Sequence, residues 1–214
     1  MKSDITLPTR MSTDLAELIG IILGDGSISL KTNTLNNRLK ISFNSKDDTD
    51  YIFYVKDLIK SLFNVDPILK YRKNENTADL FVFRKDIINY LVNDVGLRLS
   101  PKWNRAIIPK KLMSPNLNLM VLRGYFDTDG CLALVNNNGI IYPRLEMKIC
   151  PSPMQKQFAQ ILKDNKFNFG AYDIGKGKIR IQLNGKLQLN RWSKLVGFSN
   201  EKHLNKLVTF LKVQ

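Results

Sequence analysis

The chain has 214 residues, enough for one large domain or for two domains of about 100 residues each. Hydrophobic residues make up 43% of it, so a core can form and wholesale disorder is excluded. The net charge of +14 points to a polyanionic partner, for which nucleic acid is the first candidate and an anionic membrane surface the second.

The scarcity of cysteine and histidine narrows the chemistry. Cys131 and Cys150 are the only cysteines and His203 is the only histidine, which excludes a disulfide framework, a four-cysteine zinc site and a histidine-rich metal site. No apolar run reaches the roughly 18 residues that a membrane-spanning helix needs. The first residues lack the apolar core of a signal peptide. We therefore expect an intracellular protein, cytoplasmic or organellar, with no secretion signal and no membrane partner.

The first half of the chain begins with an arm and an apolar helix. Residues 1–11 are expected to form a loose arm, and residues 14–24 an apolar helix, with helix-capping candidates at Ser12, Thr13 and Asp14. Alternating and helical patterns then predict two strands, an amphipathic helix, two further strands and a short helix. The strands are expected at 27–31, 38–44, 68–73 and 78–83, with the amphipathic helix around 52–62.

The second half repeats this order. An apolar helix over 117–128 is followed by two strands with a hairpin tip at 136–139, and then by an amphipathic helix with Phe158, Ile161 and Leu162 on one face. Two more strands and a short helix complete the half. The four strands are expected at 131–135, 144–149, 171–174 and 178–183.

Two nine-residue segments indicate a duplication. LIGIILGDG at 18–26 recurs as LRGYFDTDG at 122–130, with Leu, Gly, Asp and Gly in the same places 104 residues apart. Later polar residues match in the same order at comparable distances from these segments. The pattern predicts an α+β protein made of two αββαββα halves. We expect the arm at 1–11, the halves at 12–109 and 117–214, and a linker at 110–116.

The repeated segments carry glycines and acids at equivalent places. Gly20 and Gly24 lie one turn apart on a helix, where glycine costs roughly 1 kcal/mol relative to alanine, so a close contact with the second helix around Gly124 is expected to compensate. Asp25 and Asp129 fall at helix C-termini, where the helix dipole disfavours an acid. A divalent cation such as Mg²⁺ would relieve their mutual repulsion, which beside a basic surface indicates phosphodiester hydrolysis. The alternative is a pair of ordinary helix-ending Asp-Gly turns.

At these residues the sequence resembles the LAGLIDADG homing endonucleases and their maturase relatives, and its two motifs resemble the single-chain, pseudo-dimeric members. The resemblance implies two motif helices at an interface and two antiparallel sheets that form a saddle over DNA. It implies that Asp25 and Asp129 hold catalytic Mg²⁺, with Mn²⁺ as a substitute, and we expect Gly24 and Thr128 to join them as metal ligands. Leu23 departs from the acid that is usual at the sixth motif position. Asp127 in the second copy keeps that acid and is expected to cap or pack rather than to bind metal.

The resemblance also implies a polar residue on the second strand of each half and a lysine near the scissile phosphate. Asn44 and Lys148 each lie 19 residues after the motif aspartate, and Lys102 and Lys202 match each other further along. We assign all four to the catalytic site. The alternatives are solvent-facing strand residues and a chance match in a lysine-rich chain. His203 is expected on a helix surface.

Strand alternation predicts the surface that contacts DNA, because alternate residues of each strand face away from the core. Such a surface can bind phosphates and read base edges in the major groove, although any half-buried sheet has a solvated face. Small apolar residues replace polar ones on one strand of the second half, which predicts a target that is not a strict palindrome. The predicted DNA-binding residues are Ser29, Lys31, Arg38, Lys40, Ser42, Lys70, Arg72, Arg144, Glu146, Lys178, Arg180 and Gln182.

The leading interpretation is therefore a metal-dependent, site-specific double-strand DNA endonuclease with a long target, acting as a monomer. One alternative is an RNA maturase that binds intron RNA and assists group I intron splicing. Another is a non-cleaving DNA-binding regulator on the same scaffold. Retention of both motif aspartates favours the enzyme over the regulator.

Overall fold

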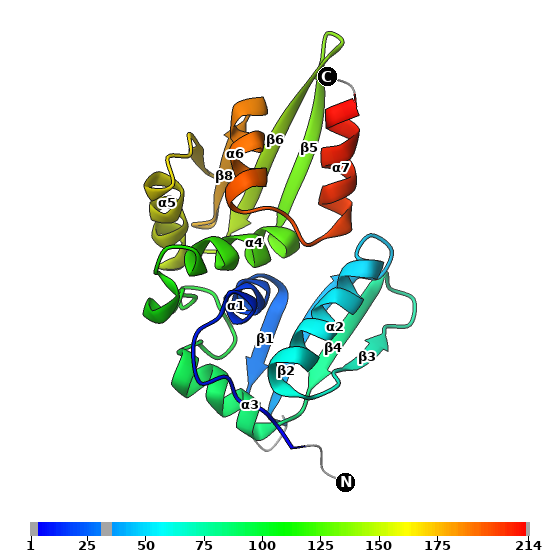
Figure 1. The fold of residues 1–214 in the computed structure, drawn as a ribbon, viewed down its shortest axis with the longest axis vertical. Helices are drawn as coiled ribbons and strands as arrows, with labels where there is room; N and C mark the ends of the chain where they lie inside the picture. Colours follow the sequence, from blue (N-terminus) through cyan, green and yellow to red (C-terminus); the bar gives the residue numbers. More distant parts are fainter. Residues whose placement is uncertain (1–3, 31–35, 213–214) are drawn as a thin grey trace.

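The computed structural model describes residues 4–30 and 36–212 and contains two similar halves, with one helix of each at the contact between them (Figure 1). The first half has α1 (Thr13–Asp25), β1 (Gly26–Ser29), β2 (Arg38–Asn44), α2 (Thr49–Phe63), β3 (Ile68–Tyr71), β4 (Thr77–Val82), α3 (Lys85–Asn89) and the π-helical η1 (Tyr90–Val95). After the short 3₁₀ turn η2 (Lys110–Leu112), the second half has α4 (Leu117–Asp129), β5 (Gly130–Asn137), β6 (Ile140–Ile149), α5 (Met154–Asp164), β7 (Gly170–Asp173), β8 (Ile179–Asn184), α6 (Lys186–Leu195) and α7 (Glu201–Lys212).

Each half contains one four-stranded antiparallel sheet. The strand orders are β1-β2-β4-β3 and β5-β6-β8-β7. In each half the two hairpins are therefore joined by pairing of their second strands, β2 with β4 and β6 with β8. Along β2, Leu39, Ile41 and Phe43 are buried while the residues between them are not. Tyr51 of α2 packs edge-on against Phe43, so α2 covers the core side and leaves the other face open. The predicted α+β fold of two pseudo-symmetric halves is confirmed.

Helices α1 and α4 cross in close contact, as the glycine spacing predicts. A Cβ added to Gly20 would lie 2.1 Å from the carbonyl oxygen of Val121, and one added to Gly124 would lie 2.1 Å from that of Glu17. Both distances are far below any real carbon–oxygen contact. Only glycine therefore allows the two backbones to approach this closely, and the approach brings the C-terminal ends of both helices together.

The register of the first hairpin differs between the halves by two residues. Gly26 pairs with Ile41, whereas Gly130 pairs with Met147. Lys148 therefore occupies the place of Ser42, one residue beyond the partner of the glycine. The sequence count that made Asn44 the equivalent of Lys148 is corrected here, because the connection between the paired strands differs in length.

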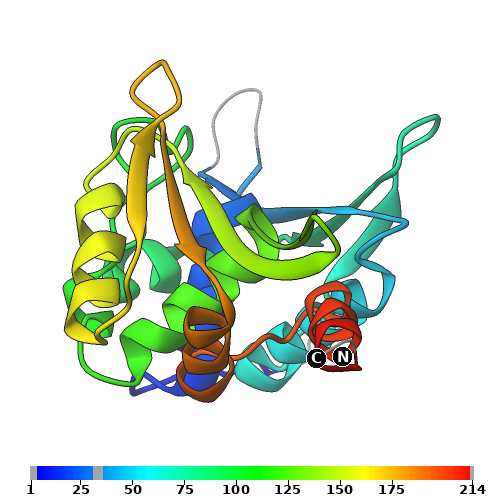
Figure 2. The same cartoon turned by 90° about the horizontal axis from the view of Figure 1, so that it is seen from above.

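Other differences from the expected elements concern the ends of the chain. The arm is tied down over its described part, since the amide of Thr6 donates to the carbonyl of Phe63 at 3.1 Å and Asn64 donates to that of Asp4 at 2.9 Å. The second half ends in two helices, and the second of them, α7, runs along β5 (Figure 1). Seen from above, α2 (cyan), α6 (orange-brown) and α7 (red) lie on one side and the strands on the other (Figure 2). None of the helices in the described parts of the chain is long and apolar enough to cross a membrane.

Candidate active site

The two motif aspartates meet where α1 and α4 end. Ser12 caps the start of α1 by accepting from the amide of Leu15 at 3.1 Å, and α1 then runs without a break to Asp25. Across the contact, a Cβ on Gly24 would lie 3.5 Å from Oδ2 of Asp129, so this carboxylate sits directly beside the end of the other helix. The structure thus brings together the two residues that the repeat singled out.

Both carboxyl groups resist ionisation. Desolvation by the surrounding protein, reinforced by the charge of Asp129, raises the pKa of Asp25 to about 6, against the opposing effect of Lys102. Desolvation also raises the pKa of Asp129, and Lys102 and a hydrogen bond from Tyr125 oppose that rise. Because positive charge nearby lowers the pKa of a carboxyl group, a bound cation would stabilise the ionised forms of both aspartates, as Lys102 already does in part.

Lys102 lies between the two helix ends. Its segment runs along β1, where the amide of Ser100 donates to the carbonyl of Ile28 at 3.0 Å. The Lys102 ammonium donates to the carbonyl of Leu23 at 2.8 Å and also to that of Gly24. Burial lowers its pKa, and the two aspartates counteract this effect. The predicted Lys102 is therefore at the centre of the site.

The oxygen atoms gathered here suit a hard divalent cation. The last carbonyls of α1 already bind one positive charge, the Lys102 ammonium, and the nearby charges of Asp25 and Asp129 stabilise it, which shows that this place accepts a cation. Of the other expected ligands, the Gly24 carbonyl is bound to Lys102, and the Thr128 hydroxyl donates to the carbonyl of Tyr125 at 2.9 Å. Within the residues that the structure describes, no group of three His, Cys, Asp or Glu side chains could hold a metal, so protein carboxylates alone do not complete a coordination shell.

Lys202 is placed differently from Lys102. Its ammonium forms an ion pair with Oδ1 of Asp48 at 2.7 Å, although its charge still lowers the pKa of Asp25. Asn200 donates to the same Asp48 oxygen at 2.8 Å and to the carbonyl of Asp127, at the end of α4, at 3.1 Å. Sequence reasoning missed Asp48 and Asn200, because neither belongs to a motif and their contact joins residues 152 positions apart.

Asp127 anchors the segment before α7. Its carboxylate accepts from the amide of Ser199 at 2.6 Å and lies 3.1 Å from Nδ1 of His203. This arrangement agrees with the expected capping role. The expectation for His203 is wrong, because its side chain is fully buried against Phe126 and Phe198. The helical pattern could not reveal this, since α7 packs against a strand far away in the sequence.

An open cavity of about 480 Å³ lies beside Asp129. Lys102, Lys148, Lys178 and the indole of Trp103 line it together with that carboxylate. Asn44, by contrast, folds back on its own loop and donates to Asp47 at 2.7 Å. The structure therefore brings Lys148 to the site and leaves Asn44 engaged at the end of β2.

Most of the predicted DNA-binding residues that the structure describes are half-buried, and only Lys70 and Arg72 are exposed. Several of the charged groups among them form ion pairs. Arg72 donates to Asp79 through Nε at 2.8 Å and through Nη2 at 3.1 Å, and Ser42 donates to the same carboxylate at 2.6 Å. Arg144 pairs with Glu146 at 3.3 Å, on the matching strand of the second half. Lys31 lies outside the described residues. The remaining predicted residues occupy the non-core positions of their strands or turns, namely Ser29, Arg38, Lys40, Lys70, Lys178, Arg180 and Gln182.

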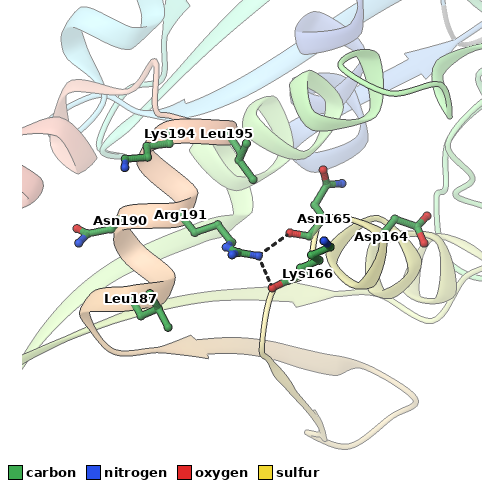
Figure 3. A pocket seen from close by; sticks show the side chains of 8 residues that line it. All are labelled: Asp164, Asn165, Lys166, Leu187, Asn190, Arg191, Lys194 and Leu195. Atoms are coloured by element: carbon green, nitrogen blue, oxygen red, sulfur yellow. Dashed lines mark hydrogen bonds between the residues drawn. The ribbon is translucent and has the colours of Figure 1, made fainter.

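A separate cavity of about 590 Å³ lies between α5 and α6 (Figure 3). Arg191 crosses it and donates to the carbonyl of Lys166 at 2.7 Å and to that of Asn165 at 3.2 Å. Leu187 and Lys194 of α6 also line it. None of the predicted site residues is among its lining residues, so it is distinct from the site at the helix ends.

Comparison with known proteins gives concordant matches. The sequence model of the LAGLIDADG DNA endonuclease family matches residues 16–187. A stretch of the replication factor C small subunit of Methanocaldococcus jannaschii is 26% identical over 208 residues, which cover 93% of this chain and 10% of that protein. The chain thus spans about a tenth of the length of this curated relative.

Solved structures share the fold at low sequence identity. I-DmoI in complex with DNA and Mn is 18% identical, with a TM-score of 0.60 over 88% of this chain and 98% of that one. I-WcaI bound to its DNA recognition sequence is 20% identical, with a TM-score of 0.61 over 92% and 87%. The N-terminal LAGLIDADG domain of DUF199/WhiA is 15% identical, with a TM-score of 0.54 over 90% and 85%.

Proposed function

Because the chain belongs to the LAGLIDADG DNA endonuclease family, we propose that it is a divalent-metal-dependent endonuclease that cuts both strands of one long, non-palindromic DNA site as a monomer. The observation that carries this proposal is that the close contact of α1 with α4 brings Asp25 and Asp129 to neighbouring helix ends, with the Lys102 ammonium bound to the last carbonyls of α1. A site that only bound DNA would have no need for two desolvated acids facing the duplex.

Mg²⁺ is the proposed cofactor, with Mn²⁺ as a substitute. Asp25 and Asp129 would hold it, with the carbonyls of Gly24 and Thr128 as further ligands, and the bound ion would supply charge neutralisation and an acidified water. Structures of I-DmoI are solved with Mn, Ca and Mg, which supports divalent metal use in this fold. Binding at Gly24 would require the Lys102 ammonium to leave that carbonyl.

The protein side chains act on the phosphate. The Lys102 and Lys148 ammonium groups lie in the cavity beside Asp129, where they can bind the scissile phosphate and stabilise the charge that develops on it. On the Asp25 side, Lys202 would do the same only after separating from Asp48. We infer that the saddle of two sheets holds the duplex, with phosphate contacts providing affinity and polar strand residues reading bases.

The decisive experiment incubates the protein with a large DNA library in Mg²⁺ and, in parallel, in Ca²⁺, followed by sequencing of new double-strand ends. We expect one long site that is cut in Mg²⁺ and is bound without cleavage in Ca²⁺. Asp25→Asn and Asp129→Asn should retain binding and lose cleavage. Normal cutting of both strands by either variant would overturn the shared metal site, and specific retention without ends would identify a non-cleaving binder.

A further inference from the structure

An exposed tryptophan forms one wall of the cavity beside Asp129. Trp103 is 42% exposed, and the ammonium of Lys178 lies 5.4 Å from the centroid of its indole ring. The two residues come from different halves, since Trp103 follows Lys102 and Lys178 precedes β8. A large aromatic surface is thus left open to solvent in the most cationic part of the candidate site.

Two hydrogen bonds fix this wall, one between the halves and one within the second half. The amide of Asn104 donates to the carbonyl of Pro151 at 2.6 Å, and Gln155 donates to the carbonyl of Gly177 at 2.8 Å. The loop that carries Trp103 and the turn that carries Lys178 are therefore both attached where β6 leads into α5, the loop at Pro151 and the turn at Gln155 in the first turn of α5. Figure 2 shows the two loops rising on the strand side of the molecule. A rigid aromatic side chain in this position loses little entropy when a ligand covers it.

Among the described residues, the Asp25 side of the site has no equivalent aromatic wall at the position after its lysine. The residue that follows Lys202 is His203, which is buried on the core side of α7, and Lys202 itself is paired with Asp48. Beside Asp129, the ammonium groups of three lysines and the indole of Trp103 line the cavity. Beside Asp25, the lysine is held in its ion pair with Asp48. The two sides therefore present different surfaces to whatever occupies the site.

We propose that Trp103 packs against a nucleotide of the DNA strand lying over Asp129, with Lys148 and Lys178 on the neighbouring phosphates, and so positions that strand for cleavage. The inference rests on the proposed function and adds a residue that lies outside both motifs. The cavity offers both kinds of contact that a nucleotide needs. The three ammonium groups suit its phosphate, and the exposed indole suits its base or sugar. Continuity of the cavity with Asp129 places this nucleotide next to the cleaved bond.

Tryptophan emission tests the contact directly. The chain has two tryptophans, and Trp192 is fully buried, so a change in emission on DNA binding reports Trp103. The probe is the pool of 30-base-pair duplexes that the protein retains from a random library in Ca²⁺. We expect quenching in the wild type and no quenching in Trp103→Phe, which keeps an aromatic ring and should keep most of the affinity.

Binding and strand-resolved cleavage complete the test. Trp103→Ala should weaken binding of the fluorescently labelled pool about tenfold, as loss of one aromatic–nucleotide contact does. It should also slow the cutting of one strand more than the other, and Trp103→Phe should restore both. Phe53→Ala is the matched control, because Phe53 is 49% exposed on α2, away from the strand face, and its loss should change neither readout.

The outcomes separate the two proposals. Retention of duplexes with unchanged wild-type emission and unchanged Trp103→Ala affinity would overturn the role of Trp103 and leave the endonuclease proposal standing. Failure to retain any duplex would overturn the DNA-binding function and this inference with it. The emission measurement uses the wild-type protein, so the test holds even if Trp103→Ala does not fold.

Discussion

Lys102 shows how one side chain sets the chemistry of two others. Its ammonium sits at the negative end of α1 and counteracts the repulsion between Asp25 and Asp129, while burial lowers its own pKa. In this cluster, Asp25 is therefore poised between its charged and neutral forms near pH 6. Small changes in local charge should therefore alter both metal binding and stability.

The first prediction concerns the pH dependence of cleavage. A carboxyl group must be ionised to bind a metal, and the pKa of Asp25 is raised to about 6. Cleavage in Mg²⁺ should therefore fall about tenfold per unit as the pH drops below about 6, rather than near the ordinary carboxyl value of about 4. Single-turnover rates measured between pH 5 and 8 on the selected site test this.

Lys102→Met sharpens that prediction. Removal of the ammonium takes away a charge that lowers both carboxyl pKa values, so the fall in rate should move to higher pH as the maximal rate decreases. A control, Lys194→Met on α6, should leave the profile unchanged. An unshifted profile in Lys102→Met would contradict the assigned electrostatic role.

The second prediction is that Asp25 destabilises the metal-free protein. Its carboxyl pKa is higher in the folded state than in the unfolded chain, so the folded state loses stability as the pH rises from about 4 through about 6. With EDTA at pH 7.5, Asp25→Asn should raise the free energy of unfolding by on the order of 1 kcal/mol, a figure discounted for the exposure of this side chain.

Urea denaturation measures this difference. Asp57→Asn, an exposed change on α2, should stay within about 0.5 kcal/mol of the wild type. A less stable Asp25→Asn protein would contradict the prediction and show that the carboxylate stabilises the metal-free fold as a partner of Lys102.

At the scale of the elements, the contact of α1 with α4 holds the site together. Backbone atoms of each helix occupy the space where a side chain on the glycines of the other would lie. The aspartates follow five residues after these glycines, so any separation of the helices would also separate the acids. Stability and catalysis therefore depend on the same contact.

The third prediction follows from that contact. Gly20→Ala places a methyl group against the Val121 carbonyl and should lower the free energy of unfolding by about 3 kcal/mol, because backbone atoms cannot yield as side chains do. Thermal and urea unfolding measure the loss. Gly139→Asn is the control, since no atom lies within 4 Å of its Cβ position and asparagine tolerates its positive φ of 85°.

Local patterns predicted the elements well, and long-range contacts limited the prediction of the site. Hydrophobic alternation placed the strands, and the glycine spacing placed α1 against α4. The equivalence of Asn44 and Lys148 failed because a count along the chain cannot detect a two-residue shift in pairing. Asp48 and Trp103 act through contacts across the two halves, which no local pattern encodes.

At the scale of the whole molecule, the chain is strongly basic, and the non-core faces of both sheets carry part of its positive charge. The net charge of +14 is large for 214 residues, and the cations on the non-core faces of the strands include Arg38, Lys40, Lys70, Arg144, Lys148 and Arg180. Exposure of this kind favours fast, salt-sensitive association with a polyanion before any sequence is read.

The fourth prediction is a steep salt dependence of DNA binding. If six to ten phosphates are contacted, affinity should fall about a thousandfold or more between about 50 and 200 mM salt, since each contact releases counterions. Lys70→Ala on β3 should reduce the slope of log Kd against log salt by about one, whereas Lys194→Ala on α6 should not. Fluorescence anisotropy with labelled duplex measures the slopes, and a flat dependence would argue against the basic saddle.

The loop between Ser100 and Ile108 has a consequence for engineering. It belongs to the first half by sequence, yet Asn104 bonds to Pro151, Ala106 to Met154 and Ile108 to Gln157. In a chimera that joins this half to the half of another protein at the linker, the loop would lose the hydrogen-bond partners that the second half supplies. Modular retargeting of this scaffold therefore requires a junction before that loop, or a recipient surface redesigned to receive it.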